Sequence, residues 1–166
     1  FVTVMETDDG ELELVCTECD YPWRPKTPTP GAAPARSGYA ADLGLYEDLL
    51  TCLHHADGWT EHGVIEHRYQ QLRPQTYRNE LLPRYGHHAD GSNTTYSVSK
   101  FLAGAMGQLH REGLITNHRW KPTGYWTYLG AVSWWSWSPD TDTNHRLSWT
   151  DYATTNNLDP DAWPLS

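Results

Sequence analysis

The sequence predicts an α+β protein, and three stretches carry that prediction. In residues 96–115, apolar residues recur every three or four positions, as on one face of a helix. Residues 1–23 and 114–137 alternate apolar and polar side chains around glycine-containing turns, the pattern of β-hairpins. A chain of 166 residues with these features suits one main domain with extensions.

The N-terminal hairpin is expected over residues 1–23. Asp-Asp-Gly at positions 8–10 separates its two strands as a turn. The second strand runs into Cys16-Thr-Glu-Cys19, and a Cys-x-x-Cys on a hairpin resembles one knuckle of a zinc ribbon. That family needs a second such pair, which this chain lacks.

Cys52 and His55 are the candidates for completing a zinc site with Cys16 and Cys19. They lie three positions apart on a helix predicted for residues 40–56, so both can face one ion, and Cys3His is a known structural ligand set. The alternative is that Cys52 is a small core residue and His55 a solvated one. A redox role is not favoured, because no βαβ unit follows the cysteine pair. One structural zinc ion is therefore predicted, with the metal-free alternative open.

Residues 24–38 are rich in proline, which excludes a helix and favours an extended spacer. This linker is the clearest boundary in the chain, and it leads to a main domain over residues 39–138. Residues 139–166 are polar and acidic, so we predict a C-terminal tail of which much lacks regular structure, with Leu158 and Trp163 as the residues that would dock it.

The main domain is expected to contain further helices before the one at residues 96–112. They are predicted at 40–56, from Thr60 to about Leu72, and from Pro74 to Leu82, where Pro74 suits the first helical position. Their predicted core residues are Leu45, Tyr46, Leu49, Leu53, Ala56, Val64, Ile65, Tyr69 and Leu72.

The last helix carries both of its end signals. Ser97 or Ser99 can cap its start, and Gly113 is suited to the left-handed conformation that ends a helix. We then expect a strand over 115–120, a turn at 121–124, and a return strand that begins at Tyr125 and continues to Trp137.

A helix that ends in Leu-x-x-x-Gly-Leu-Ile and turns directly into a hairpin resembles helix 3 and the wing of a winged helix-turn-helix domain. The resemblance covers residues 40–138 and depends mainly on residues 96–137 and on the order helix, helix, helix, hairpin. It implies that helix 3 enters the major groove of DNA while the hairpin lies against the backbone or minor groove. One departure is a spacing of roughly twenty residues between helices 2 and 3, where compact domains use a few.

The formal net charge of −9 argues against DNA binding, because phosphate attraction supplies most nonspecific affinity. Local patches matter more than the total, however, and basic residues cluster where the helix meets the wing. The resemblance implies a DNA-binding regulator of transcription, of the kind encoded by phages or mobile elements. The residues expected to contact DNA are Ser97, Ser99, Lys100, Gly104, Arg111, Arg119 and Lys121.

A second hypothesis is an acidic protein-interaction module, an adaptor or inhibitor that does not bind DNA. Residues 125–137 carry aromatic side chains on both faces, so either the N-terminal hairpin, a partner protein or a second subunit of a homodimer is expected to cover them. An enzyme is not favoured, because Gly-x-x-x-x-Gly-Lys-Ser/Thr and Gly-x-Ser-x-Gly are both absent. The polar stretch from His87 to Asn93 is interpreted as a solvated loop rather than a nuclease centre.

The sequence favours a cytoplasmic protein. No run of about eighteen apolar residues is present, so no membrane span is expected. The first residues lack the pattern of a signal peptide, although an upstream segment is left open. Three cysteines do not form a closed set of disulfides, which favours a reducing compartment.

Overall fold

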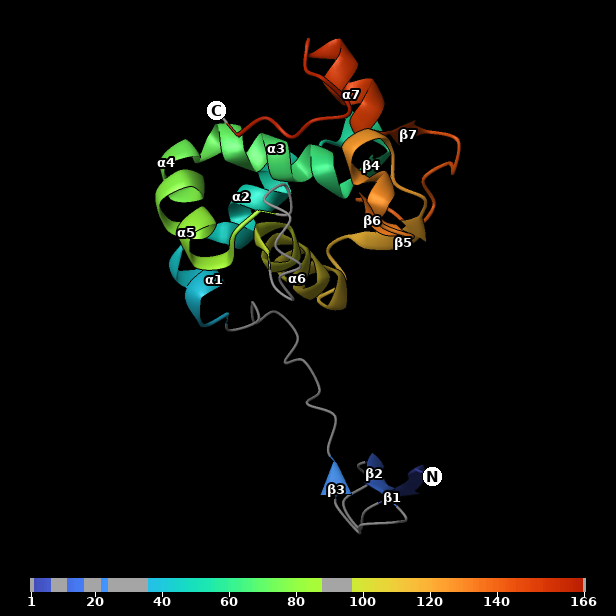
Figure 1. Ribbon diagram of the computed structural model, residues 1–166. Helices are drawn as coiled ribbons and strands as arrows, with labels where there is room; N and C mark the ends of the chain where they lie inside the picture. Colours follow the sequence, from blue (N-terminus) through green and yellow to red (C-terminus); the bar gives the residue numbers. More distant parts are fainter. Residues whose placement is uncertain (1, 7–11, 17–21, 24–35, 88–96, 166) are drawn as a thin grey trace. The chain divides into compact units, whose positions relative to one another are not determined.

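The computed structural model describes residues 2–6, 12–16, 22–23, 36–87 and 97–165 (Figure 1). The chain divides into two compact units, residues 1–35 and 36–166.

The first unit is an antiparallel sheet in the order β1-β2-β3. Val2 pairs with Cys16 and Glu6 with Leu12, so the predicted hairpin is present, and a short third strand is added to it. The expected turn at 8–10 and Cys19 lie outside the described residues, as do residues 24–35 of the expected linker. The strands are β1 (Val2–Glu6), β2 (Leu12–Cys16) and β3 (Pro22–Trp23).

The second unit combines helices with a four-stranded sheet, which places the protein in the α+β class. Its helical elements are α1 (Tyr39–Asp42), α2 (Leu45–Cys52), η1 (His55–Asp57), α3 (His62–Leu72), α4 (Pro74–Thr76), the π-helical η2 (Tyr77–Leu81), α5 (Leu82–Tyr85), α6 (Val98–Arg111), η4 (Gly124–Tyr128) and α7 (Trp149–Thr155). Its strands are β4 (Trp59–Glu61), β5 (Thr116–Trp120), β6 (Val132–Ser136) and β7 (Arg146–Leu147).

The single helix predicted for residues 40–56 is wrong, because the chain is broken there twice. Gly44 adopts a left-handed conformation with φ of 63°, which separates α1 from α2. Helix α2 then ends at Cys52, so His55 lies in the separate 3₁₀ turn η1. Ala56, expected in the core, is exposed.

The second predicted helix begins later than expected, because residues 59–61 form the strand β4, which pairs with β6 and β7. Val64, Ile65 and Tyr69 are buried as predicted, whereas Leu72 is 41% exposed. The third predicted helix starts at Pro74 as expected but continues beyond Leu82, through the π-helical turn η2 and into α5.

Helix α6 has the ends that its sequence predicts. The Oγ of Ser97 accepts a hydrogen bond from the backbone N–H of Lys100 at 3.3 Å, which caps its start. Gly113 has a φ of 76°. The N–H of Gly113 donates to the carbonyl of His110 and that of Leu114 to the carbonyl of Leu109, which is a Schellman motif. This tight turn sends the chain directly into β5.

The hairpin after α6 is present, but its return strand is shorter than predicted. Strand β5 pairs with β6 so that Thr116 faces Ser136 and Trp120 faces Val132. The segment expected to begin the return strand is instead the 3₁₀ helix η4, and the N–H of Tyr125 donates to the carbonyl of Pro160 at 2.7 Å. Docking of the C-terminal segment thus takes the place of strand pairing.

The C-terminal tail contains a strand and a helix that were not predicted, and Trp163 docks as expected. Strand β7 pairs in parallel with β4, α7 follows it, and the chain then runs back along α3 (Figure 1). Large aromatic side chains anchor this polar segment to the domain: Trp149 is fully buried and Trp163 is 7% exposed. They form a core cluster with Val64, Trp126, Tyr152 and Ala153.

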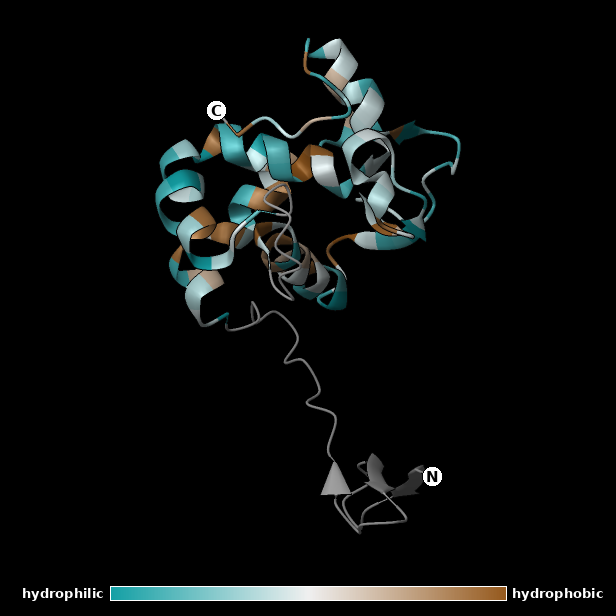
Figure 2. Cartoon of the chain, in the orientation of Figure 1, coloured by the Kyte–Doolittle hydropathy of each residue, from teal (hydrophilic) through white to brown (hydrophobic). Residues whose placement is uncertain are grey.

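The main core lies between α2, α3, η2 and α6 and includes Trp135 of β6. Figure 2 shows hydrophobic residues gathered where these helices meet. Within the described residues, no helix is long and apolar enough to cross a membrane.

Candidate nucleic-acid interface

A pocket of about 190 Å³ opens between α6, the start of α3 and the β5–β6 hairpin. We refer to it as the α6–hairpin pocket. Lys100 reaches it from the first turn of α6, and Arg119 reaches it from β5. Its lining residues are His62, Gly63, Ser99, Lys100, Ala103, Arg119, Trp126, Leu129, Ala131, Val132 and Ser133.

The strand register explains why Arg119 faces α6. Alternate side chains of a strand lie on opposite faces, and Arg119 pairs with Ser133 while the neighbouring His118 pairs with Trp134. Arg119 and Ser133 therefore share the face that carries Trp135, which packs in the helical core. The guanidinium is also held in place, because its Nη2 donates to the carbonyl of Ala131 at 3.0 Å.

The lining of the pocket is positively charged, whereas the chain as a whole is negatively charged. The protein carries a net charge of −9, yet the described residues that line the pocket include two permanent cations and no Asp or Glu. Both Lys100 and Arg119 are exposed to solvent. An anion that entered the pocket would therefore meet a local positive potential.

Ser99 forms the inner wall of the pocket and is held by two residues of α3. Its carbonyl accepts a hydrogen bond from Nε2 of His62 at 3.0 Å, and its hydroxyl donates to the carboxylate of Glu66. The Nδ1 of His62 accepts from the indole N–H of Trp135 at 3.2 Å. Because a carbonyl only accepts and an indole N–H only donates, the imidazole is neutral with its proton on Nε2. Burial lowers the pKa of His62 to about 4, against the opposing effect of the Ser99 hydrogen bond.

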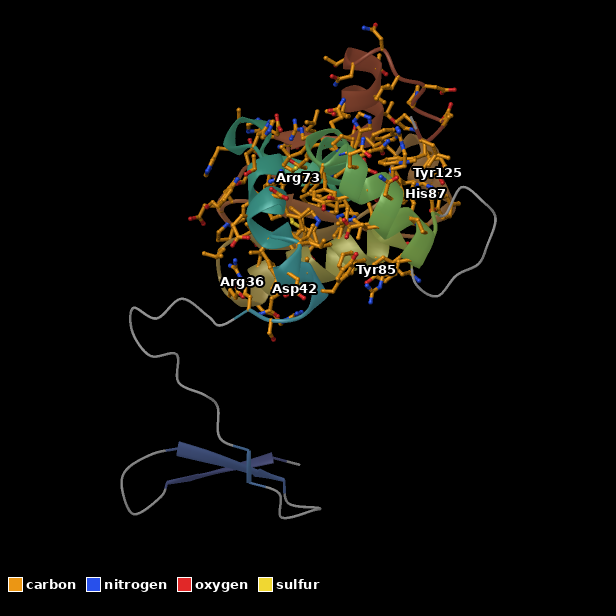
Figure 3. All side chains as sticks on the ribbon, turned by 90° about the vertical axis from the view of Figure 1, so that its left-hand side faces the viewer. Arg36, Asp42, Arg73, Tyr85, His87 and Tyr125 are labelled. Carbon is orange, nitrogen blue, oxygen red and sulfur yellow. The ribbon has the colours of Figure 1, made fainter. Side chains whose placement is uncertain are left out.

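Glu66 lies behind Ser99 and is completely buried. Its carboxylate accepts from the hydroxyl of Tyr77 at 2.8 Å, and Nε2 of His87 lies 3.7 Å away. His87 lies beside Tyr125, with ring centroids 6.0 Å apart (Figure 3). Burial raises the pKa of Glu66 to about 7, while the hydrogen bonds from Ser99 and Tyr77 lower it.

A second buried carboxylate joins the hairpin loop to the C-terminal segment. Glu61 accepts from the N–H and the hydroxyl of Thr123 at 2.8 and 2.7 Å, and from the N–H of Trp149 at 2.8 Å. Burial raises the pKa of Glu61, whereas these hydrogen bonds lower it. The contact connects β4, the loop before η4 and the first turn of α7.

The predicted DNA-contacting residues separate into two groups. Ser97 is fully buried and Ser99 is 7% exposed, with its hydroxyl engaged by Glu66, so neither position favours contact with DNA. The rest are exposed on α6 and the hairpin, and of these only Lys100 and Arg119 line the pocket. The exposed residues are Lys100, Gly104, Arg111, Arg119 and Lys121.

Sequence reasoning missed His62 and Trp126 as parts of the site. The only sequence signal was their aromatic character, because their roles depend on contacts with distant elements. Gly63 allows one of these contacts, since a Cβ there would lie 2.2 Å from the indole nitrogen of Trp126.

The structure describes three of the four predicted zinc ligands. Cys52 is 3% exposed within the helical core, and burial raises the pKa of its thiol to about 12. His55 is exposed and stacks on Trp137, with ring centroids 4.4 Å apart. Cys16 ends β2, and Cys19 lies outside the described residues. No group of three or more His, Cys, Asp or Glu residues suited to a metal occurs in the part of the chain that the structure describes.

The aromatic strand expected to receive a partner is largely buried by its own chain. Trp134 packs with Trp59, Val132, Trp120 and Leu129 on one face of the sheet. Strand β6 is paired on both sides, with β5 and β4. The 3₁₀ helix η4 before it is more accessible, since Tyr128 at its end is 54% exposed. No known family, curated protein or solved structure matches this chain.

Proposed function

We propose that residues 39–138 form a winged helix-turn-helix domain that binds double-stranded DNA and regulates transcription. The protein would be encoded by a phage or mobile element and would act in the cytoplasm. The order helix, helix, helix, hairpin supports this proposal, with α2, α3 and α6 as the three helices and with α4, η2 and α5 inserted between α3 and α6. The short strand β4 before α3 pairs with β6, so the hairpin is joined directly to the helical part of the domain.

The observation that carries the proposal is that Lys100 and Arg119 line one pocket with no acidic residue in its described lining. In a chain with a net charge of −9, a cationic site requires such local concentration. One of these cations comes from the helix and the other from the hairpin, the two elements that contact DNA in this family. A phosphate at the mouth of the pocket would be within the field of both.

The exposed face of α6 suits close approach to a duplex. Gly104 is exposed with open space around it, and Gly107 is partly exposed. Arg111 extends the basic face to the far end of α6, and its guanidinium donates to the side chain of Gln108 at 2.9 Å. Lys121 continues it at the end of the hairpin strand. Contacts of this kind hold the backbone, with limited readout of base sequence.

The salt dependence of DNA affinity tests this surface. Lys100→Gln should flatten the slope of log K against log salt by about 1, and Arg119→Gln with Lys121→Gln by about 2, since each lost phosphate contact removes nearly one released counterion. Arg78→Gln is the charge-matched control, because Arg78 is exposed on η2 and does not line the pocket. Equal slopes for wild type and the variant that combines Lys100→Gln, Arg119→Gln and Lys121→Gln would exclude this surface as the DNA site.

The second candidate is a protein-interaction module, and the exposure of Tyr128 favours it. Tyr128 ends the 3₁₀ helix η4 and is 54% exposed, and large exposed aromatic rings are common anchors of protein interfaces. If the partner is a second copy of this chain, light scattering should show a dimer that Tyr128→Ser converts to a monomer. A monomer at all concentrations, combined with salt-dependent DNA binding, would favour the first candidate.

A further inference from the structure

We propose that the α6–hairpin pocket binds a small carboxylic acid that carries a single aromatic ring. The pocket has an apolar half and a cationic half. Its apolar wall comes from Ala103, Trp126, Leu129 and Val132. Arg119 and Lys100 provide positive charge, so the lining matches a ligand with an apolar body and one negative group.

The dimensions of the pocket set the size of the ligand. An engineered apolar cavity of about 150 Å³ in another protein holds benzene. The volume of about 190 Å³ here accommodates one ring with a small substituent. Small-molecule sites commonly combine such apolar walls with a few polar groups that fix orientation.

Arg119 is prepared to hold the carboxylate. One of its nitrogens is bound to the Ala131 carbonyl, which orients the planar guanidinium at the edge of the pocket. Arg119 forms no ion pair with any of the described residues, so none of their carboxylates neutralises its charge. A guanidinium fork matches the geometry of a carboxylate, which favours this anion over a monatomic one.

The indole of Trp126 forms the aromatic wall of the pocket, and the absence of a side chain at Gly63 gives it room. Any side chain at this position would displace the indole of Trp126, because a Cβ would lie 2.2 Å from its nitrogen. The indole therefore packs directly against the first turn of α3 and forms one side of the pocket. A ring of a ligand can contact this surface by stacking or edge-to-face packing.

Benzoate titration followed by ¹H–¹⁵N NMR tests the proposal, with benzyl alcohol as the neutral analogue and acetate as the anion without a ring. Benzoate should shift the indole N–H of Trp126 and the amides of Ala103, Arg119 and Val132. Its affinity should exceed that of either analogue by about tenfold to a hundredfold, the equivalent of one charged hydrogen bond.

Two variants separate the two halves of the site. Arg119→Gln should reduce benzoate affinity to that of benzyl alcohol, whereas the control Arg78→Gln should leave it unchanged. Ala103→Leu should fill the pocket and abolish binding of both benzoate and benzyl alcohol, with the dispersed spectrum serving as the test that the variant is folded. Absence of saturable shifts, equal affinity for benzoate and benzyl alcohol, or equal affinity for acetate would each overturn the proposal.

Competition with DNA follows only if the proposed function is also correct, because both ligands would use Lys100 and Arg119. Benzoate should then weaken DNA binding by the wild type, and Ala103→Leu should make DNA binding insensitive to benzoate. If benzoate binds as predicted but DNA does not, the proposed function fails while the ligand site stands. If DNA binds and benzoate does not, only the ligand site fails.

Discussion

Nδ1 of His62 accepts a 3.2 Å hydrogen bond from the indole N–H of Trp135, so the ring that supports the first turn of α6 is held in its neutral form. Protonation would place two N–H groups against each other in the core. The same turn is also held by Glu66, one turn further along α3, whose carboxylate accepts from the Ser99 hydroxyl. Two buried groups with opposite responses to pH therefore support one residue of α6.

The two groups should offset each other in the pH dependence of stability. The pKa of Glu66 is raised from 4.5 to about 7, so its contribution is full below pH 4.5 and is lost as pH rises through 7. The pKa of His62 is lowered from 6.5 to about 4, so its contribution is full above pH 6.5 and is lost as pH falls through 4. Each amounts to about 3 kcal/mol, and their windows overlap between pH 4.5 and 6.5.

Single variants should expose each effect. Relative to wild type, Glu66→Gln should lose stability and His62→Gln should gain it as pH falls from 6.5 to 4.5. Urea unfolding at several pH values measures these differences, and other carboxylates cancel in the comparison with wild type. Parallel curves for wild type and both variants would show that neither group is perturbed by burial.

Leu109 should contribute to stability in proportion to its burial. It is fully buried in α6, so Leu109→Ala should cost about 2 to 5 kcal/mol in the free energy of unfolding. Leu114 is 42% exposed only five positions later, and Leu114→Ala should cost less than about 1 kcal/mol. Chemical denaturation of the pair provides the check, and equal losses would contradict the packing of α6.

Gly104→Ala should stabilise the protein and weaken DNA binding together. Gly104 is an interior residue of α6 with nothing within 4 Å of an added Cβ, so alanine should gain about 1 kcal/mol of stability. If this face meets DNA, the added methyl group should reduce affinity. Thermal unfolding and a binding titration separate the two effects, and unchanged DNA affinity would place the duplex elsewhere.

Glu61→Gln should destabilise the second unit by about 1 to 3 kcal/mol, because an amide cannot accept from all three donors that the carboxylate satisfies. Asp140→Asn removes the same charge at an exposed position and serves as the control. Equal unfolding midpoints for the two variants would mean that the hydrogen bonds to Glu61 contribute little.

Zinc content tests the predicted metal site. The prediction is about one zinc ion per chain, held by Cys16, Cys19, Cys52 and His55. Elemental analysis of protein purified without chelator gives the stoichiometry, and none bound would exclude the site. Loss of zinc in Cys52→Ala would show that Cys52 is a ligand. Because burial raises the pKa of its thiol, zinc would have to displace the thiol proton in order to bind there. Retention of zinc in His55→Ala would refute only the ligand set.

Local signals in the sequence predicted α6 well. Its periodic apolar residues, its Ser97 cap and its Gly113 end act within a few positions of one another, so each is visible without tertiary structure. The α6–hairpin pocket was only half predictable. Lys100 and Arg119 were found as basic residues near a helix–hairpin junction, but the places of His62 and Trp126 depend on contacts across the fold.

The errors have the same physical origin. The strand at 59–61 is too short to show a period, and it forms because β6 and β7 pair on either side of it. The 3₁₀ helix η4 replaces a strand because the C-terminal segment bonds to Tyr125. In residues 139–166, Trp163 was expected as a docking residue, but the acidic composition concealed the buried Trp149 and the helix that carries it.

The hydrogen bond between Glu61 and Trp149 joins residues 88 positions apart. During synthesis, the helices around Leu49, Leu102 and Leu109 would leave the ribosome while this carboxylate still lacked its last donor. Contacts of such long range form late, because the intervening chain must first be ordered. The second unit should therefore remain sensitive to proteases and chaperones until α7 emerges, and a stalled chain that ends before Ser148 should be recognised as incomplete.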